Sequence, residues 1–157
     1  MTNQEINIFG RKIAGASKSQ LVVIMYEIAI KYIDDGVDAL KNNDIENYRL
    51  NLKRSKTVIN ELTSSLDMTQ NISLELRRLY VFMTGVLVKA DIRKETEELL
   101  RVRQMLIKLS NAFEIVSECD SSGPIMENTQ AVYAGLTYSK DSLNENMYSD
   151  LNRGFKV

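Results

Sequence analysis

The stretch LVVIMYEIAIKYI, residues 21–33, carries the strongest structural signal in the sequence. Glu27 and Lys31 are its only charged residues, and their spacing of four places them side by side on a helix. At 100° per residue, the apolar positions of residues 18–40 cover an arc of roughly 220°, whereas a surface helix needs only about 100° to face its core. The sequence therefore predicts a helix whose apolar surface must be covered by other helices, by the chain's own ends or by another protein.

The stretch before this helix, GRKIAGASKS at residues 10–19, has the glycine separation of a nucleotide-binding P-loop. Ala16 occupies the position where a P-loop needs its lysine, and no strand-forming run precedes it. Ser17 followed by Gln20 has instead the spacing of a capping box, which begins a helix. We therefore expect a helix over about residues 17–42 and no nucleotide site.

Three further apolar seams follow and predict helices over about residues 44–66, 72–91 and 94–118. Asp44 is the expected N-cap of the first of these helices. The seam residues alternate by three and four: Ile45, Tyr48, Leu52, Ile59, Leu62 and Leu66; then Ile72, Leu76, Leu79, Met83, Val86 and Ala90; then Leu99, Val102, Leu106, Leu109, Phe113 and Val116. Joined by short polar links, such seams predict an all-α fold, an antiparallel four-helix bundle. We expect one bundle domain over residues 1–118, of which a flexible N-terminal arm occupies 1–16.

The sequence changes character from Asp120 onward, where Ser, Asn, Gly and the single Pro replace the regular apolar spacing. This change indicates a domain boundary and a C-terminal extension over residues 119–157. The extension nevertheless carries apolar residues in which disordered segments are poor: Ile125, Met126, Tyr133, Leu136, Tyr138, Leu143, Tyr148 and Phe155. We expect it to pack in part on the bundle or to become ordered on a partner.

The composition argues against most catalytic and metal-dependent chemistry. The 157 residues contain no His and one Cys, so the usual zinc sites and Ser–His or Cys–His pairs cannot be built. We expect no cofactor, no metal and no enzymatic activity. A net charge of −1 predicts no nucleic-acid partner, and the lack of 18 consecutive apolar residues predicts no direct membrane insertion. The lone Cys119, together with a start unlike a signal peptide, favours a cytoplasmic location.

Seven short blocks in five groups follow one another in a fixed order between residues 8 and 118. They are AS at 16–17 with IMYE at 24–27, LK at 52–53 with VINEL at 58–62, SLD at 65–67, LYVFM at 79–83 and LVKADI at 87–92. Together they resemble sequence blocks of the flagellin export chaperones, the FliS family, which lie at the start of the first helix, within the later helices and at a turn. The C-terminal extension is similar to one found in clostridial members of that family.

The resemblance implies a chaperone that binds the C-terminal segment of flagellin in the cytoplasm and prevents its premature polymerisation. It implies delivery of this client to the export gate of the flagellar type III apparatus, with the client bound as helices around the bundle. Part of the client would compete with the chaperone's arm, for which we expect four residues to form a temporary lid: Ile6, Ile8, Phe9 and Ile13. Seven residues are expected to be shared between the core and the partner-binding groove: Leu21, Val22, Tyr26, Leu76, Leu79, Tyr80 and Met83.

Two alternatives from other classes of protein remain open from the residues alone. In the first, the chain is a helical adaptor with no flagellin client, and its surplus apolar surface forms a homodimer. In the second, it is an enzyme whose site uses only carboxylates, Lys and Tyr, and a buried acidic pair on facing helices would be the first sign of such a site.

Overall fold

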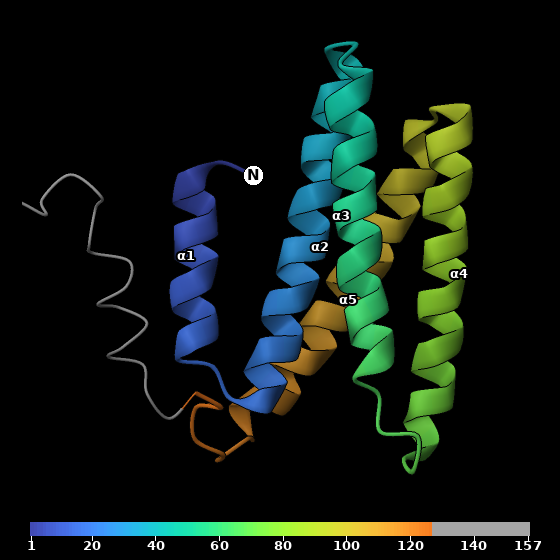
Figure 1. The fold of residues 1–157 in the computed structure, drawn as a ribbon. Helices are drawn as coiled ribbons and strands as arrows, with labels where there is room; N and C mark the ends of the chain where they lie inside the picture. The colour runs from blue at the N-terminus through green and yellow to red at the C-terminus, as the bar shows by residue number, and fades with distance from the viewer. Residues whose placement is uncertain (127–157) are drawn as a thin grey trace, which may run out of the picture. The chain divides into compact units, whose positions relative to one another are not determined.

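The computed structural model describes residues 1–126, and every regular element in this part of the chain is a helix. The helices are α1 (Asn3–Ala14), α2 (Lys18–Lys41), α3 (Ile45–Ser64), α4 (Asn71–Arg93) and α5 (Thr96–Glu118) (Figure 1). The all-α prediction is confirmed for these residues. None of the five described helices combines the length and the apolarity that crossing a membrane requires. The expected packing of the C-terminal extension stays a prediction, since residues 127–157 lie outside the described part.

Helices α2 to α5 begin and end within two residues of the positions expected from their seams. Ser17 and Gln20 form the predicted capping box at the start of α2, each side chain accepting from the other's backbone N–H. Asp44 caps α3 by accepting a hydrogen bond from the backbone N–H of Asn47. Local capping chemistry therefore defines where these two helices begin.

The N-terminal arm differs from the sequence prediction, because Asn3–Ala14 form a helix rather than a flexible segment. Thr2 and Glu5 form a second capping box, in which the Thr2 hydroxyl accepts from Glu5 N–H and the Glu5 carboxylate from Thr2 N–H. A helix of 12 residues is marginal on its own in water. The reason that α1 is helical here is thus its packing against α2 in addition to its cap.

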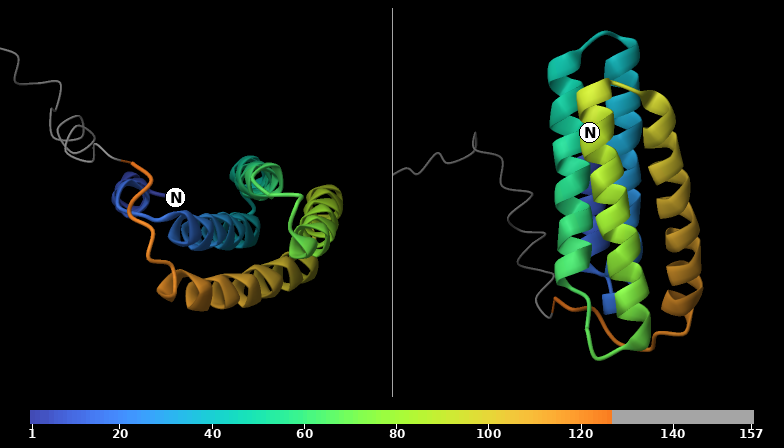
Figure 2. Two further views of the ribbon diagram at one scale, coloured as in Figure 1. Left: turned by 90° about the horizontal axis from the view of Figure 1, so that it is seen from below. Right: turned by 90° about the vertical axis from the view of Figure 1, so that its right-hand side faces the viewer.

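The helices pack chiefly with their neighbours. Within residues 1–126, α2 packs against α3 and α5, α4 packs against α3 and α5, and the main partner of α1 is α2. Consecutive helices from α2 to α5 run in alternating directions (Figure 1). Both figures place α1 and α4 at opposite sides of this group of helices (Figures 1 and 2). The two surfaces discussed below therefore lie on different sides of the bundle.

Three other helices cover much of the wide apolar surface of α2. No residue from Leu21 to Val37 is exposed, because α1, α3 and α5 all pack against this helix. At Gly36 the backbone of α2 lies close to α3, since an added Cβ would lie 2.9 Å from Leu52 Cδ1. The chain's own first helix thus supplies part of the cover that the sequence requires.

Three tyrosines lie in the core with their hydroxyl groups paired. Tyr26, Tyr48 and Tyr80 are 0%, 0% and 1% exposed. The hydroxyl of Tyr48 donates to the carbonyl of Ala90 at 2.7 Å, and the hydroxyls of Tyr26 and Tyr80 bond to each other. Burial raises the pKa of Tyr48 to about 12 and also raises the pKa of Tyr26 and of Tyr80. The Tyr26–Tyr80 pair joins α2 to α4 across the core.

Substituting either tyrosine of this pair by phenylalanine should destabilise the protein. Tyr26→Phe and Tyr80→Phe each leave the other hydroxyl buried without a partner, which costs about 1–2 kcal/mol in free energy of unfolding. The double variant removes both hydroxyls, so its loss should be smaller than the sum of the two single losses. Urea unfolding followed by far-UV circular dichroism measures all three. Additive losses would show that the two hydroxyls do not depend on each other.

Candidate partner-binding surface

Helix α4 is apolar on two opposite faces. Its inner face lies in the core and comprises Leu76, Tyr80, Met83, Leu87 and Ala90. On its outer side Leu74, Val81, Val88 and Ile92 are 52%, 61%, 43% and 76% exposed. The first three are spaced by seven residues and Ile92 follows four later, so they form one line along the helix, with Gly85 in its middle. We call these five residues the outer stripe.

Gly85 gives the outer stripe a point of close approach. A Cβ built at Gly85 meets nothing within 4 Å, so the backbone of α4 is open to the outside at this position. Glycine inside a helix destabilises it by about 1 kcal/mol relative to alanine. Its place in the middle of an exposed apolar line suits a partner whose backbone comes close to α4.

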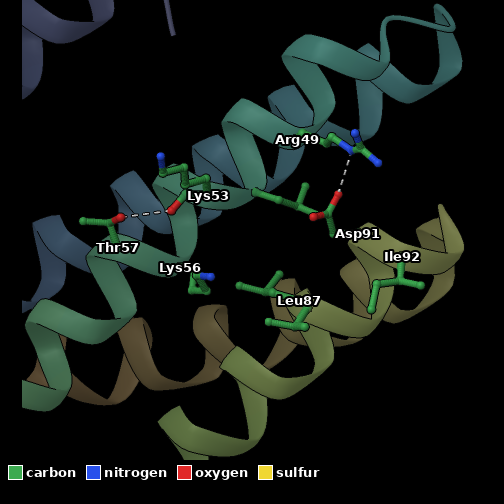
Figure 3. A pocket seen from close by; sticks show the side chains of 9 residues that line it. Arg49, Lys53, Lys56, Thr57, Leu87, Asp91 and Ile92 are labelled. Carbon is green, nitrogen blue, oxygen red and sulfur yellow. Dashed lines mark hydrogen bonds and ion pairs between the residues drawn. The ribbon is translucent and has the colours of Figure 1, made fainter.

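A groove between α3 and α4 borders the outer stripe (Figure 3). It has a volume of about 380 Å³, and Arg49, Lys53 and Lys56 of α3 form its basic wall. The α4 side includes Ile92, which also belongs to the outer stripe, and Asp91. The Nε atom of Arg49 lies 3.4 Å from Oδ1 of Asp91 in an exposed ion pair, and exposed pairs of this kind contribute little stability. Apolar and basic groups thus lie side by side here.

A second groove, between α4 and α5, borders the other side of α4. Its volume is about 310 Å³, and its apolar lining includes Phe82, Val102 and Met105. Phe82 is 58% exposed and also lines a shallower hollow with Leu74 and Val81 on the surface of α4. The outer stripe is therefore flanked on both sides by space that side chains of a partner can enter.

A different surface, on α2, is covered by α1 through ion pairs. The Nζ atom of Lys31 lies 2.9 Å from Glu5 of α1 and 2.9 Å from Asp35, and Lys12 of α1 lies 2.6 Å from Glu27. The hydrogen bond from Lys31 lowers the pKa of Glu5 from 4.5 to about 2. The stabilisation from this pair is therefore complete above pH 4.5 and is lost as the pH falls towards 2.

The apolar contact between α1 and α2 is small. Phe9 and Ile13 of the expected lid are half-buried, whereas Ile6 and Ile8 are 51% and 54% exposed. The partly exposed ion pairs that add to this contact are weakened by salt. Helix α1 is consequently the described helix with the least to hold it in place, which suits a removable cover.

The structure divides the seven residues predicted for the groove between the core and two helices. Tyr26, Leu76, Tyr80 and Met83 are buried, at 0%, 7%, 1% and 0% exposure. Leu21 and Val22 are half-buried on α2, and Leu79 is 37% exposed on α4. A partner can reach the four core residues only if a helix moves, whereas the other three are accessible in part.

The outer stripe is missing from the residues predicted from sequence. Its signal was present, because Leu74, Val81 and Val88 repeat every seven residues. The inner face of α4 has similar helical spacing, and spacing alone does not tell which of two apolar faces a bundle buries. Only the packing of α4 against α3 and α5 decides between them.

Two adjacent acidic residues of α2, Asp34 and Asp35, are engaged in ion pairs. Asp34 accepts from Nε of Arg103 at 2.6 Å, which links α2 to α5, and Asp35 pairs with Lys31. In the part of the chain that the structure describes, no three His, Cys, Asp or Glu side chains are grouped to hold a metal ion. Among residues 1–126, none of the buried polar residues is an Asp or a Glu.

Comparison with known proteins shows the family of this chain. Residues 2–119 match the family described as "Flagellar protein FliS", and the match includes all five described helices. A curated relative, the flagellar secretion chaperone FliS of Bacillus subtilis (strain 168), is 26% identical over 99 residues, which are 63% of this chain and 74% of that protein. Because the family match extends over most of the sequence, the protein belongs to the FliS family of flagellar proteins.

Proposed function

We propose that the protein is a flagellar secretion chaperone that binds the C-terminal segment of flagellin in the cytoplasm. It keeps this segment from polymerising prematurely and delivers it to the flagellar export gate. The observation that carries the proposal is the exposed outer stripe of α4, on a helix whose inner face is already buried in the core. Membership of the FliS family and the name of the Bacillus subtilis relative support the same function.

The outer stripe suits a helical client. Apolar residues repeated every seven positions match the contact line of a partner helix, and Gly85 allows that helix to come close. The grooves beside α4 provide room for the client's larger side chains. An apolar surface of this kind promotes aggregation when it has no partner, so its retention on a surface helix favours a binding role.

The surface under α1 is the second part of the proposed binding site. The α2 face that pairs with α1 carries Glu27 and Lys31, and by helical spacing Ile24 and Ile28 lie on the same face. A client segment that takes the place of α1 can pack on this face of α2. In this proposal, α2 to α5 form an antiparallel four-helix scaffold for the client. The partly exposed Leu21, Val22 and Leu79 belong to the proposed contacts, and the four buried residues support them from the core.

Apolar burial is sufficient to drive this binding without charge chemistry. Ordering a client segment costs about 2–5 kcal/mol. Burial of apolar surface contributes about 25 cal/mol per Å², so several hundred Å² offset this cost. The resulting complex should show a large negative heat-capacity change.

Isothermal titration of the protein with the C-terminal segment of flagellin from the same organism tests the proposed function. We expect one-to-one binding with a negative heat-capacity change. A variant that begins at Ser17 lacks α1 and should bind roughly tenfold more tightly, because the competing cover is gone. If neither form binds the segment, the flagellin assignment is wrong. A stable dimer in sedimentation velocity would then favour the homodimeric adaptor.

Introducing a charge into the outer stripe should weaken client binding. Val81 is 61% exposed, so Val81→Asp leaves the core intact but requires a carboxylate to be buried under the client, which should reduce affinity at least tenfold. Val116→Asp is the matched control, since Val116 is 56% exposed on α5, away from the outer stripe. Calorimetry compares the client affinity of the two variants, and circular dichroism verifies that both are folded. Equal losses of affinity would contradict a client site on α4.

A further inference from the structure

The residues that follow α5 attach to the link between α1 and α2. Oδ2 of Asp120 accepts hydrogen bonds from the hydroxyl of Ser19 and, at 3.4 Å, from its backbone N–H. Oδ1 of Asp120 accepts from the backbone N–H of Ser122 at 2.9 Å. The backbone N–H of Ile125 donates to the carbonyl of Ala16 at 3.0 Å. We call residues 120–125 the strap.

Two residues of the link that the strap contacts, Ala16 and Ser17, are buried. Ala16 and Ser17 are 3% and 4% exposed, although connecting segments normally lie at the surface. Buried backbone groups need hydrogen-bond partners, and the link has them. The Ala16 N–H donates to Ile13 at 3.2 Å, and the Ser17 N–H donates to the side chain of Gln20 at 3.0 Å. The Ser17 carbonyl accepts from the Leu21 N–H at 2.9 Å, and Ile125 of the strap supplies the partner for the last group, the Ala16 carbonyl.

Asp120 also completes the cap of α2. Ser17 accepts from the Gln20 N–H at the start of this helix, and Asp120 accepts from the Ser19 N–H one position earlier. A negative charge at the N-terminus of a helix is favourable. Hydrogen bonds from Ser122 and Ser19 hold the pKa of Asp120 well below its usual range. The carboxylate of Asp120 is therefore charged at neutral pH, and it binds both Ser122 of the strap and Ser19 of α2.

We infer that the strap locks the α1–α2 link in the conformation that keeps α1 on α2. Helix α1 can swing away from α2 only by rotation of the backbone around Gly15 to Ser17. Such rotation moves the Ala16 carbonyl away from the Ile125 N–H, so undocking of α1 requires release of the strap. The strap thereby controls access to the α2 face under α1.

The lock is a property of the C-terminal extension. The match to the FliS family ends at residue 119, directly before Asp120. The extension thus begins with the residues that hold α1 in place. The inference rests on the proposed function only for its consequence, the opening of a client surface, because the lock itself acts in the free protein.

Hydrogen–deuterium exchange of the full-length protein, without any client, tests the lock. Asp120→Ala removes the acceptor for Ser19, and Ile125→Pro removes the N–H that bonds to Ala16. In both variants we expect amides of α1 to exchange roughly fivefold or more faster than in the unaltered protein. Amides of α3 and α4 should exchange at unchanged rates.

Asp67→Ala is the matched control. Asp67 also stabilises a loop through its carboxylate, which accepts from the N–H and hydroxyl of Thr69 between α3 and α4, but this loop is not attached to α1. We expect this variant to leave the exchange of α1 unchanged. Unchanged exchange of α1 in both strap variants would overturn the inference, and so would an equal increase in all helices. Neither result depends on flagellin binding, so the proposed function is tested separately.

Discussion

The apolar surface of α2 is too broad to be buried against one side of a core. An arc of roughly 220° cannot face a core on one side only, so α2 must be enclosed. Helices α3 and α5 pack against it from within the bundle, and α1 packs on it as well. Since α2 takes the central place, α4 has its main contacts with α3 and α5 and keeps its outer stripe exposed.

This arrangement produces two apolar surfaces of different character. The face of α2 is covered by a short helix that a small contact and partly exposed ion pairs hold in place. The outer stripe of α4 has no cover within residues 1–126. In the function proposed above, a long helical client uses both surfaces: it makes a first contact with the open one and reaches the other when it displaces the cover. The link at Ala16 connects the cover to the strap, and with it to the start of the C-terminal extension.

The sequence predicted the elements better than the surfaces. The capping box of Ser17 and Gln20 and the N-cap at Asp44 are local signals, and both are confirmed. Thr2 and Glu5 form the same kind of box, but 12 residues gain too little from local interactions to be helical alone. The contacts of α1 with Glu27 and Lys31 of another helix provide the rest, and such contacts cannot be read from spacing. The outer stripe was not identified for a related reason, since Val81 and Met83 are equally apolar in sequence and only tertiary packing buries one of them.

We propose that the client displaces α1 from α2 and binds the outer stripe of α4. Hydrogen–deuterium exchange of the protein, with and without the flagellin C-terminal segment, tests both parts in one measurement. We expect opposite changes: faster exchange in α1, which loses its packing partner, and slower exchange in α4 around Gly85, which gains one. Slower exchange in α1 on binding, or unchanged exchange in α4, would contradict the proposal.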